Sequence, residues 1–162
     1  MIDPAILASA EAVLAACRGR HWKLATAESC TGGLIAGALT AIAGSSDVVD
    51  RGFVTYSNEA KVAMLGVDDA VIAAVGAVSE QVARAMAEGA VRNSLADIAV
   101  AVTGVAGPGG GTEAKPVGLV WFGLATKTSV RSEYRIFPGD RAAVREATVV
   151  HALAMISQSV GG

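Results

Sequence analysis

Apolar residues along this chain follow two distinct spacings. Between Pro4 and Arg18 they recur every three or four positions, which places them on one face of a helix, and Pro4 suits the first helical turn. Further along, short β-branched or continuously apolar runs such as DIAVAVT are typical of buried strands. We therefore expect helices and strands to alternate along the chain.

The same criteria divide the rest of the sequence into further elements. The predicted strands are 21–27, 48–56, 97–103, 117–126 and 130–137. The predicted helices after 4–18 are 31–43, 58–65, 67–74, 79–93 and 140–159. Ser79 and Asp140 are expected to cap the helices that they precede, and Gly52 is expected to form a β-bulge.

The order of these elements predicts the fold class. Helices alternate with strands, and the last two strands form a hairpin through Lys127-Thr128-Ser129. This order favours an α/β fold, specifically a three-layer α/β/α sandwich with a mixed sheet. Because we find no repeat, linker or low-complexity tail, we expect residues 1–162 to form a single domain.

Composition narrows the classes of protein to which the chain can belong. Hydrophobic residues make up 52% of it, but no uninterrupted apolar run approaches the ~20 residues of a membrane helix. Lys and Arg number 13 against 15 Asp and Glu, and aromatic residues are only 4%, so the chain offers neither a basic face nor stacking platforms for nucleic acid. We expect no nucleic-acid partner and no membrane association.

The N-terminus and the cysteines bear on location and on metal binding. MIDPAILASA contains an acid and no basic segment, so we expect no export signal and a cytoplasmic protein. Cys17 and Cys30 do not form a CxxC pair. Reduced thiols, no structural disulfide and no metal site are therefore expected.

Three polar loops follow predicted strands, and each is entered through a threonine. The loops are TAESCTGG, TYSNEAK and TGVAGPGGGTEAKP, entered through Thr26, Thr55 and Thr103. Ligands of open α/β sheets bind outside the carboxyl ends of the strands. Together, the three loops predict a ligand site at that edge.

The loop TAESCTGG allows two interpretations. Ser29 or Thr31 can cap the following helix while Gly32 and Gly33 permit a tight approach. Alternatively, Ser29 is a nucleophile and the backbone N–H groups at the helix start form an anion or oxyanion site. The G-x-S-x-G pattern of a nucleophile elbow is absent, so residue types alone leave both interpretations open.

A serine nucleophile needs a base, and the two histidines are poorly placed to supply one. His21 precedes the first strand, at the opposite edge from the loops, and His151 falls in the middle of a helix. A desolvated lysine can also accept a proton. Lys61, beside Tyr56 and Asn58, is then the candidate base, although an exposed helical lysine is the simpler interpretation. Lys115 precedes a proline in a flexible loop, where we expect a solvated side chain.

The glycine-rich loop and the last helix offer binding groups. GVAGPGGGTEAKP is not a Walker A loop, and it is either a disordered surface loop or a mobile wall of the site, with Thr103 and Gly104 as its firmest part. Arg141 and Arg145 share a helix face. They are expected either to clamp a substrate phosphate or to pair with Glu146 and its neighbours.

Taken together, the motifs resemble a known family. TAESCTGG, GSSDVVDRGFVTYSNEAK, GAVSE, TGVAGPGGGTEAKPVGLVWFGLA and FPGDR look like the CinA C-terminal domain family, in the family's order and over nearly the whole chain. The enzymatic members of that family are nicotinamide mononucleotide deamidases, also called the PncC type. The chain resembles the stand-alone form, since it has no room for the additional N-terminal domain of longer CinA proteins.

The resemblance implies hydrolysis of nicotinamide mononucleotide to nicotinic acid mononucleotide and ammonia, without a metal or cofactor. The family's serine corresponds to Ser29, its lysine to Lys61 and its tyrosine to Tyr56, which relays a proton or orients Lys61. Cys30 occupies a variable position of the motif. Combined with the loops above, this predicts substrate contacts from Thr31, Gly32, Gly33, Asn58, Thr103, Gly104 and Arg141.

Two other functions remain open. The chain is alternatively a non-catalytic nucleotide-binding module linked to competence or the DNA-damage response, or a cysteine amidase that uses Cys30. The binding partner that we expect is a small-molecule substrate, a pyridine nucleotide. The Ala- and Gly-rich helices also allow close packing between subunits, so we expect a homo-oligomer.

Overall fold

A computed structural model describes residues 1–161 and contains one mixed sheet of five strands in the order β2-β1-β3-β4-β5. The strands are β1 (Leu24–Glu28), β2 (Val49–Val54), β3 (Ile98–Gly104), β4 (Leu119–Thr126) and β5 (Val130–Ile136). The helices are α1 (Pro4–Gly19), α2 (Leu34–Thr40), α3 (Asn58–Leu65), α4 (Asp69–Val75), α5 (Glu80–Arg92) and α6 (Arg141–Gly161), with a 3₁₀ turn at Ser45–Asp47.

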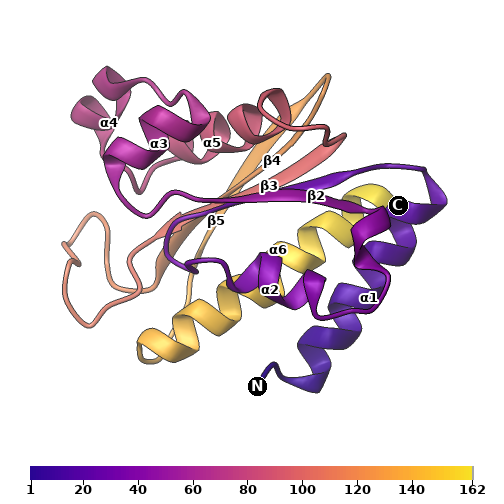
Figure 1. The fold of residues 1–162 in the computed structure, drawn as a ribbon. Coiled ribbons are helices and arrows are strands. Elements are labelled where there is room, and N and C mark those ends of the chain that lie inside the picture. Colours follow the sequence, from indigo (N-terminus) through magenta and orange to yellow (C-terminus); the bar gives the residue numbers. More distant parts are fainter. Residues whose placement is uncertain (162) are drawn as a thin grey trace.

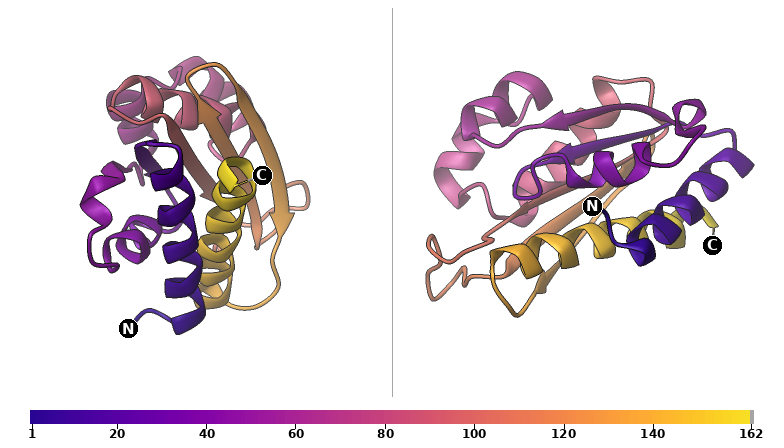
Figure 2. Two further views of the ribbon diagram at one scale, coloured as in Figure 1. Left: turned by 90° about the vertical axis from the view of Figure 1, so that its right-hand side faces the viewer. Right: turned by 60° about the horizontal axis from the view of Figure 1, so that its bottom comes forward.

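Helices cover both faces of the sheet, as Figures 1 and 2 show. α1, α2 and α6 pack on one face and bury Leu14, Ile35 and Leu153 against the sheet. α3, α4 and α5 cover the other face through a second cluster that includes Leu65 and Met86. The prediction of a three-layer α/β/α sandwich with a mixed sheet is therefore confirmed.

The strand directions bring the three polar loops to one edge. β2, β1 and β3 are mutually parallel, so their carboxyl ends lie together, whereas β4 and β5 are antiparallel and form the expected hairpin. The chain leaves β1, β2 and β3 at this edge through residues 29–33, 55–57 and 105–118. Parallel pairing thus gathers segments that are far apart in sequence.

The start of α2 differs from the prediction. The helix begins at Leu34 instead of Thr31, and its N-cap is Gly33, which has a φ of 107° and contributes no side-chain cap. The capping acceptor is instead Glu28, at the end of β1, whose carboxylate accepts from the N–H groups of Ile35 (2.8 Å) and Ala36 (3.0 Å). A carboxylate at a helix N-terminus is favoured by the unpaired N–H groups and the helix dipole. The hydroxyls of Ser29 and Thr31 are consequently not needed as caps.

The β-bulge in β2 also lies at a different residue from the one predicted. The register between β1 and β2 shifts between Leu24 and Ala25, so Asp50 is the extra residue and Gly52 pairs normally with Thr26. A Cβ at Gly52 would lie 2.7 Å from the Thr26 hydroxyl oxygen. The glycine is therefore explained by close packing on β1 and not by a bulge.

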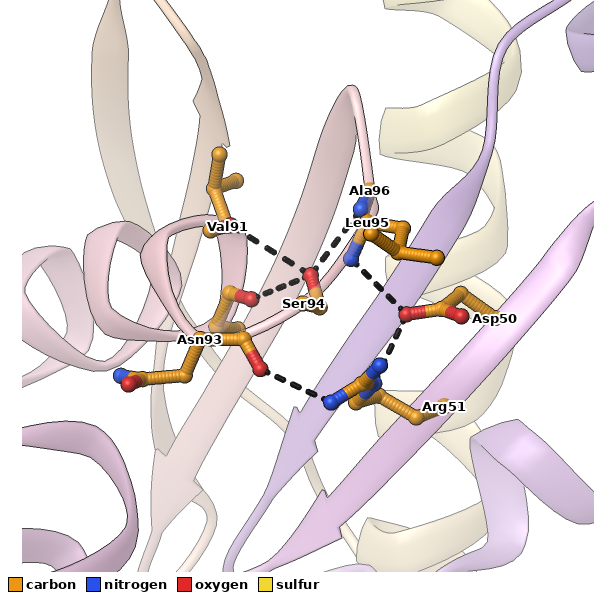
Figure 3. Close-up of polar contacts among 8 residues, drawn as sticks. Asp50, Arg51, Val91, Asn93, Ser94, Leu95 and Ala96 are labelled. Atoms are coloured by element: carbon orange, nitrogen blue, oxygen red, sulfur yellow. Dashed lines mark hydrogen bonds and ion pairs between the residues drawn. The ribbon is translucent and has the colours of Figure 1, made fainter.

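The amino edge of the parallel strands is held by a polar network (Figure 3). Asp50 accepts from the Leu95 N–H (2.9 Å) and from Arg51 Nε (2.8 Å). Arg51 Nη1 also donates to the Asn93 carbonyl (3.1 Å), and the Ser94 hydroxyl accepts from the Ala96 N–H. These contacts fasten the connection between α5 and β3 to the edge strand β2.

Expected caps on the other helices are present. Ser79 accepts from the Val82 N–H and Asp140 from the Ala143 N–H.

Within residues 1–161, no helix is both long and apolar enough to span a membrane. The same described part of the chain has no group of His, Cys, Asp and Glu residues arranged to hold a metal ion.

Candidate active site

A cleft of about 280 Å³ opens at the carboxyl edge of the parallel strands. Its lining residues are Ser29, Cys30, Tyr56, Asn58, Lys61, Ala77, Val78, Thr103, Gly104, Ala106 and Arg141. All predicted site residues except Thr31, Gly32 and Gly33 are among them. A larger cavity of about 510 Å³ between the start of α1, α2 and α6 contains no comparable pair of nucleophile and base.

Lys61 and Ser29 meet at the floor of this cleft. Ser57 caps α3 by accepting from the Ala60 N–H, and the helix then directs Lys61 inward on the same face as Leu65. Only 1% of Lys61 is exposed, and its Nζ lies 3.0 Å from Ser29 Oγ. The interpretation of Lys61 as an exposed helical lysine is therefore wrong.

The surroundings of the Lys61 amine consist of carbonyl groups. Nζ donates to the carbonyls of Thr55 (2.9 Å) and Tyr56 (3.3 Å), with Ser57 O at 3.5 Å. Within residues 1–161, no carboxylate forms an ion pair with it. Burial is the main influence on this amine and lowers the pKa of Lys61 from its ordinary 10.5. A neutral amine could bond the Thr55 and Tyr56 carbonyls with its two N–H groups and accept a proton from Ser29 with its lone pair.

Ser29 is held by the backbone at both ends of its turn. Its N–H donates to Val102 O (3.1 Å), which continues the pairing of β1 with β3, and its carbonyl accepts from the Gly32 N–H (3.1 Å). Because Glu28 caps α2, the Ser29 side chain is free to face Lys61. The acid beside the serine thus builds the turn without contacting the Ser29 hydroxyl.

Thr31 lies under the turn and does not line the cleft. Its side chain is fully buried, and its hydroxyl donates to the buried carboxylate of Glu28. Gly32 and Gly33 adopt positive φ values of 58° and 107°, which a glycine tolerates and which let the turn join α2. The three residues shape the Ser29 turn from behind.

Tyr56 and Arg141 form the rim of the cleft. The Tyr56 side chain is 63% exposed, and its hydroxyl accepts from Arg141 Nη2 (3.2 Å). Arg141 Nη1 donates to the Gly107 carbonyl (2.8 Å) and so fastens the glycine-rich loop to α6. Tyr56 hydrogen-bonds Lys61 through its main-chain carbonyl, not through its phenol. The phenol is thus placed to act on Arg141 and on whatever enters the cleft.

The glycine-rich loop is anchored at its other end as well. The Lys115 ammonium donates to the Val75 carbonyl at the end of α4, so the expectation of a solvated Lys115 is wrong. At the root of the loop, the Thr103 hydroxyl donates to Ala77 O (3.0 Å). This contact joins the cleft wall formed by β3 to the segment between α4 and α5.

The other candidate nucleophile, Cys30, and the two histidines lack the features of a reactive pair. Cys30 lines the cleft, but burial raises the pKa of its thiol to about 12, which keeps it protonated and weakly nucleophilic. His21 lies in the turn after α1, at the amino edge of the sheet. His151 packs edge-on against Phe122, and burial lowers its pKa. Neither histidine lines the cleft.

Two residues that hold the site were not identified as such from the sequence. Glu28 organises the start of α2, although its position at the end of a strand gave no capping pattern. Arg145 donates to the carbonyls of Cys30 (3.1 Å) and Thr31 (3.2 Å), so it neither lines the cleft nor pairs with Glu146. The shared face of Arg141 and Arg145 was visible in the sequence, but the different destinations of their side chains were not.

Comparison with known proteins shows the family of the chain. The sequence model of the CinA C-terminal domain matches residues 7–160. The chain belongs to the CinA C-terminal domain family. Among solved structures, the competence/damage inducible protein CihA from Agrobacterium tumefaciens is 48% identical and superimposes with a TM-score of 0.95, over 100% of this chain and 99% of that one.

Curated relatives fall into two lengths. The nicotinamide-nucleotide amidohydrolase PncC of Escherichia coli K12 is 48% identical over 159 residues, which is 98% of this chain and 96% of the relative. A competence-damage inducible protein of Caldicellulosiruptor bescii is 53% identical over 151 residues, but these are 93% of this chain and only 36% of the relative. The chain therefore spans about a third of the length of the longer relatives and nearly all of the shorter ones.

Proposed function

We propose that this chain is a nicotinamide-nucleotide amidohydrolase that converts nicotinamide mononucleotide to nicotinic acid mononucleotide and ammonia by a Ser–Lys mechanism. The observation that carries the proposal is the 3.0 Å contact between the Lys61 amine and the Ser29 hydroxyl at the floor of the cleft. A serine becomes nucleophilic when a positioned base takes its proton. The near full-length similarity to PncC proteins supports the choice of substrate.

In the first half of the reaction, Ser29 Oγ attacks the carboxamide carbon and its proton passes to Lys61 Nζ. The carboxamide oxygen becomes an oxyanion, which needs preorganised donors. When the tetrahedral intermediate collapses, the Lys61 proton moves to the departing nitrogen, which leaves as ammonia. The nicotinoyl group remains on Ser29 as an ester.

In the second half, a water molecule attacks the ester carbonyl and gives its proton to Lys61. Collapse of this intermediate returns the proton to Ser29 Oγ and releases the product as a carboxylic acid, which then gives its remaining proton to ammonia or solvent. Lys61 thus alternates between base and acid, for which its lowered pKa is suited because burial opposes permanent protonation. No metal or cofactor takes part in any step of this proposal.

The rim of the cleft is proposed to hold the rest of the nucleotide. The Arg141 guanidinium has a hydrogen-bond geometry that matches phosphate oxygens. Asn58 is exposed at the start of α3, and Thr103 and Gly104 form the opposite wall. We propose that Arg141 receives the 5′-phosphate while the ring of the substrate enters between α3 and β3.

The direct test measures ammonia release from nicotinamide mononucleotide by the purified protein. Wild-type protein is expected to turn over, Ser29→Ala to be inactive, and Cys30→Ala to retain most of the activity. Full turnover by Ser29→Ala together with an inactive Cys30→Ala would assign the nucleophile to the thiol. If wild-type protein binds the nucleotide in calorimetry but releases no ammonia, the chain is a binding module and the proposal fails.

A further inference from the structure

Arg145 reaches from α6 to the turn that carries Ser29. Its Nε donates to Cys30 O (3.1 Å) and its Nη2 to Thr31 O (3.2 Å), so one guanidinium holds two consecutive carbonyls. The side chain is partly buried, and among residues 1–161 no carboxylate pairs with it. A partly buried guanidinium that binds two backbone carbonyls instead of an acid fixes the position of that backbone.

The two carbonyls determine where the neighbouring N–H groups point. In a planar trans peptide, the C=O of one residue and the N–H of the next point in opposite directions. Because Cys30 O faces Arg145, the Thr31 N–H is directed away from Arg145. The Gly32 N–H is already occupied by Ser29 O at 3.1 Å, which closes the turn.

Two N–H groups in this turn are left without an oxygen acceptor. Those of Cys30 and Thr31 donate to no backbone or side-chain oxygen in the described chain, although both residues are buried. Buried backbone donors are normally paired. They immediately follow the nucleophile, and the N–H of the residue after a nucleophilic serine is a recurrent oxyanion donor.

We infer that Arg145 is a positioning residue for catalysis, which holds the Ser29 turn through the Cys30 and Thr31 carbonyls so that the N–H of Cys30, the cleft-lining residue after the nucleophile, stabilises the oxyanion formed on attack by Ser29. This inference rests on the proposed function. Arg145 is not among the cleft-lining residues, so the inference assigns it no direct contact with the substrate.

The test compares Arg145→Met and Arg145→Lys with wild type in steady-state kinetics on nicotinamide mononucleotide. For Arg145→Met we expect kcat to fall about 10- to 100-fold, as for a small misplacement of reacting groups, while KM stays within about two-fold. A lysine ammonium cannot bind two carbonyls with the planar geometry of a guanidinium, so Arg145→Lys should recover only part of the loss. Sub-denaturing guanidinium should raise kcat of Arg145→Ala and leave wild type unchanged.

Arg51→Met is the matched control. Arg51 also donates to a backbone carbonyl, that of Asn93, but at the amino edge of the sheet (Figure 3). It should lower the unfolding temperature about as much as Arg145→Met without changing kcat. A wild-type kcat in folded Arg145→Met, or a raised KM with unchanged kcat, would overturn the inference, the second result because it indicates direct binding.

A second readout separates this inference from the proposed function. A fluorophosphonate probe forms an ester with an activated serine and creates a similar oxyanion, whatever the natural substrate is. If wild type is labelled at Ser29 but does not hydrolyse nicotinamide mononucleotide, the substrate assignment fails, and the Arg145 inference is decided by labelling rates. Slower labelling of Arg145→Met and Arg145→Lys than of Arg51→Met supports it, and equal rates overturn it.

Discussion

Charged side chains have different partners at the two edges of the parallel strands. At the amino edge, Asp50 and Arg51 pair with each other, and both also bond backbone groups of the α5–β3 connection. At the carboxyl edge, Glu28 and Lys61 are buried and form no ion pair with any other residue of the described range 1–161. Backbone N–H groups bind the acid, and backbone carbonyls bind the amine.

This difference separates a structural contact from a reactive one. An ion pair lowers the energy of both charged forms and so keeps each partner ionised. A buried amine that meets only neutral dipoles loses that support, and its proton becomes easier to transfer. The carboxyl edge therefore combines firm positioning with a labile proton, whereas the amino edge provides positioning alone. Four substitutions or conditions can break this contrast.

The largest effect is expected from Lys61→Met, which keeps the length of the side chain and removes the amine. We expect kcat for ammonia release to fall at least about 10³-fold, because acid and base catalysis are both lost. Lys127→Met is the control, since Lys127 pairs with Asp97 (3.1 Å) near the amino edge. Comparable losses in both variants would remove the distinction between the two edges.

A smaller effect is expected at the rim. Arg141→Ala should lower kcat/KM for nicotinamide mononucleotide about 10- to 100-fold, the size expected for charge-assisted hydrogen bonds to phosphate. Nicotinamide riboside, which lacks the phosphate, should be hydrolysed with similar kcat/KM by wild type and variant. Equal losses on both substrates would mean that Arg141 acts through Tyr56 or the glycine-rich loop instead of the phosphate.

The lowered pKa of Lys61 also predicts a pH dependence of stability. Below the folded-state pKa the lysine is charged in both states, and burying the charge costs the folded protein free energy. As pH rises from there towards 10.5, the folded protein binds fewer protons than the unfolded one, so this cost is relieved. Denaturant unfolding should thus show wild type gaining stability relative to Lys61→Met as pH rises, by about 1.4 kcal/mol per unit of pKa lowering. A pH-independent difference would contradict the desolvation argument.

The smallest effect is expected from Asp50→Ala. It removes the acceptor for the Leu95 N–H and for Arg51, and should lower the free energy of unfolding by about 1 kcal/mol at pH 7 without altering kcat. The Leu95 N–H bond and the Arg51 cation hold the pKa of Asp50 below its ordinary 3.8. The stabilisation is therefore present above that value and should fade as pH falls through the lower, folded-state pKa. Urea titrations at pH 7 and at acid pH measure both parts.

Periodicity and element order were sufficient to predict the three layers and the mixed sheet, because one hydrophobic stripe or run suffices to identify an element. It located α1, α3, α5 and the β4–β5 hairpin within a few residues. It failed at the start of α2, where the cap comes from Glu28, a residue of the preceding strand. It also failed at Gly52, whose role depends on contact with Thr26 in another strand. Contacts between elements leave no spacing pattern within either element.

The candidate site could likewise be predicted only in part, because many of its contacts join different elements. Ser29 and Lys61 were candidates because each belongs to a polar loop after a strand, and parallel strands bring such loops together, but it was the family resemblance that selected them. The carbonyl cage around Lys61 and the two carbonyls held by Arg145 could not, since backbone atoms carry no residue identity. Sequence thus indicated which side chains come together, while the backbone groups that surround them became visible only in the structure.

The protected thiols have a practical consequence for studying motions of the protein. Burial raises the pKa of Cys17 to about 11 and that of Cys30 to about 12, so alkylating reagents should modify neither in the closed state. Cys17 lies on the buried face of α1, whereas Cys30 borders the cleft. Pulse alkylation followed by peptide mass analysis would therefore time the opening of the helical layer and of the cleft separately, without an introduced label. The two native cysteines thus report on the local opening of two different parts of the structure.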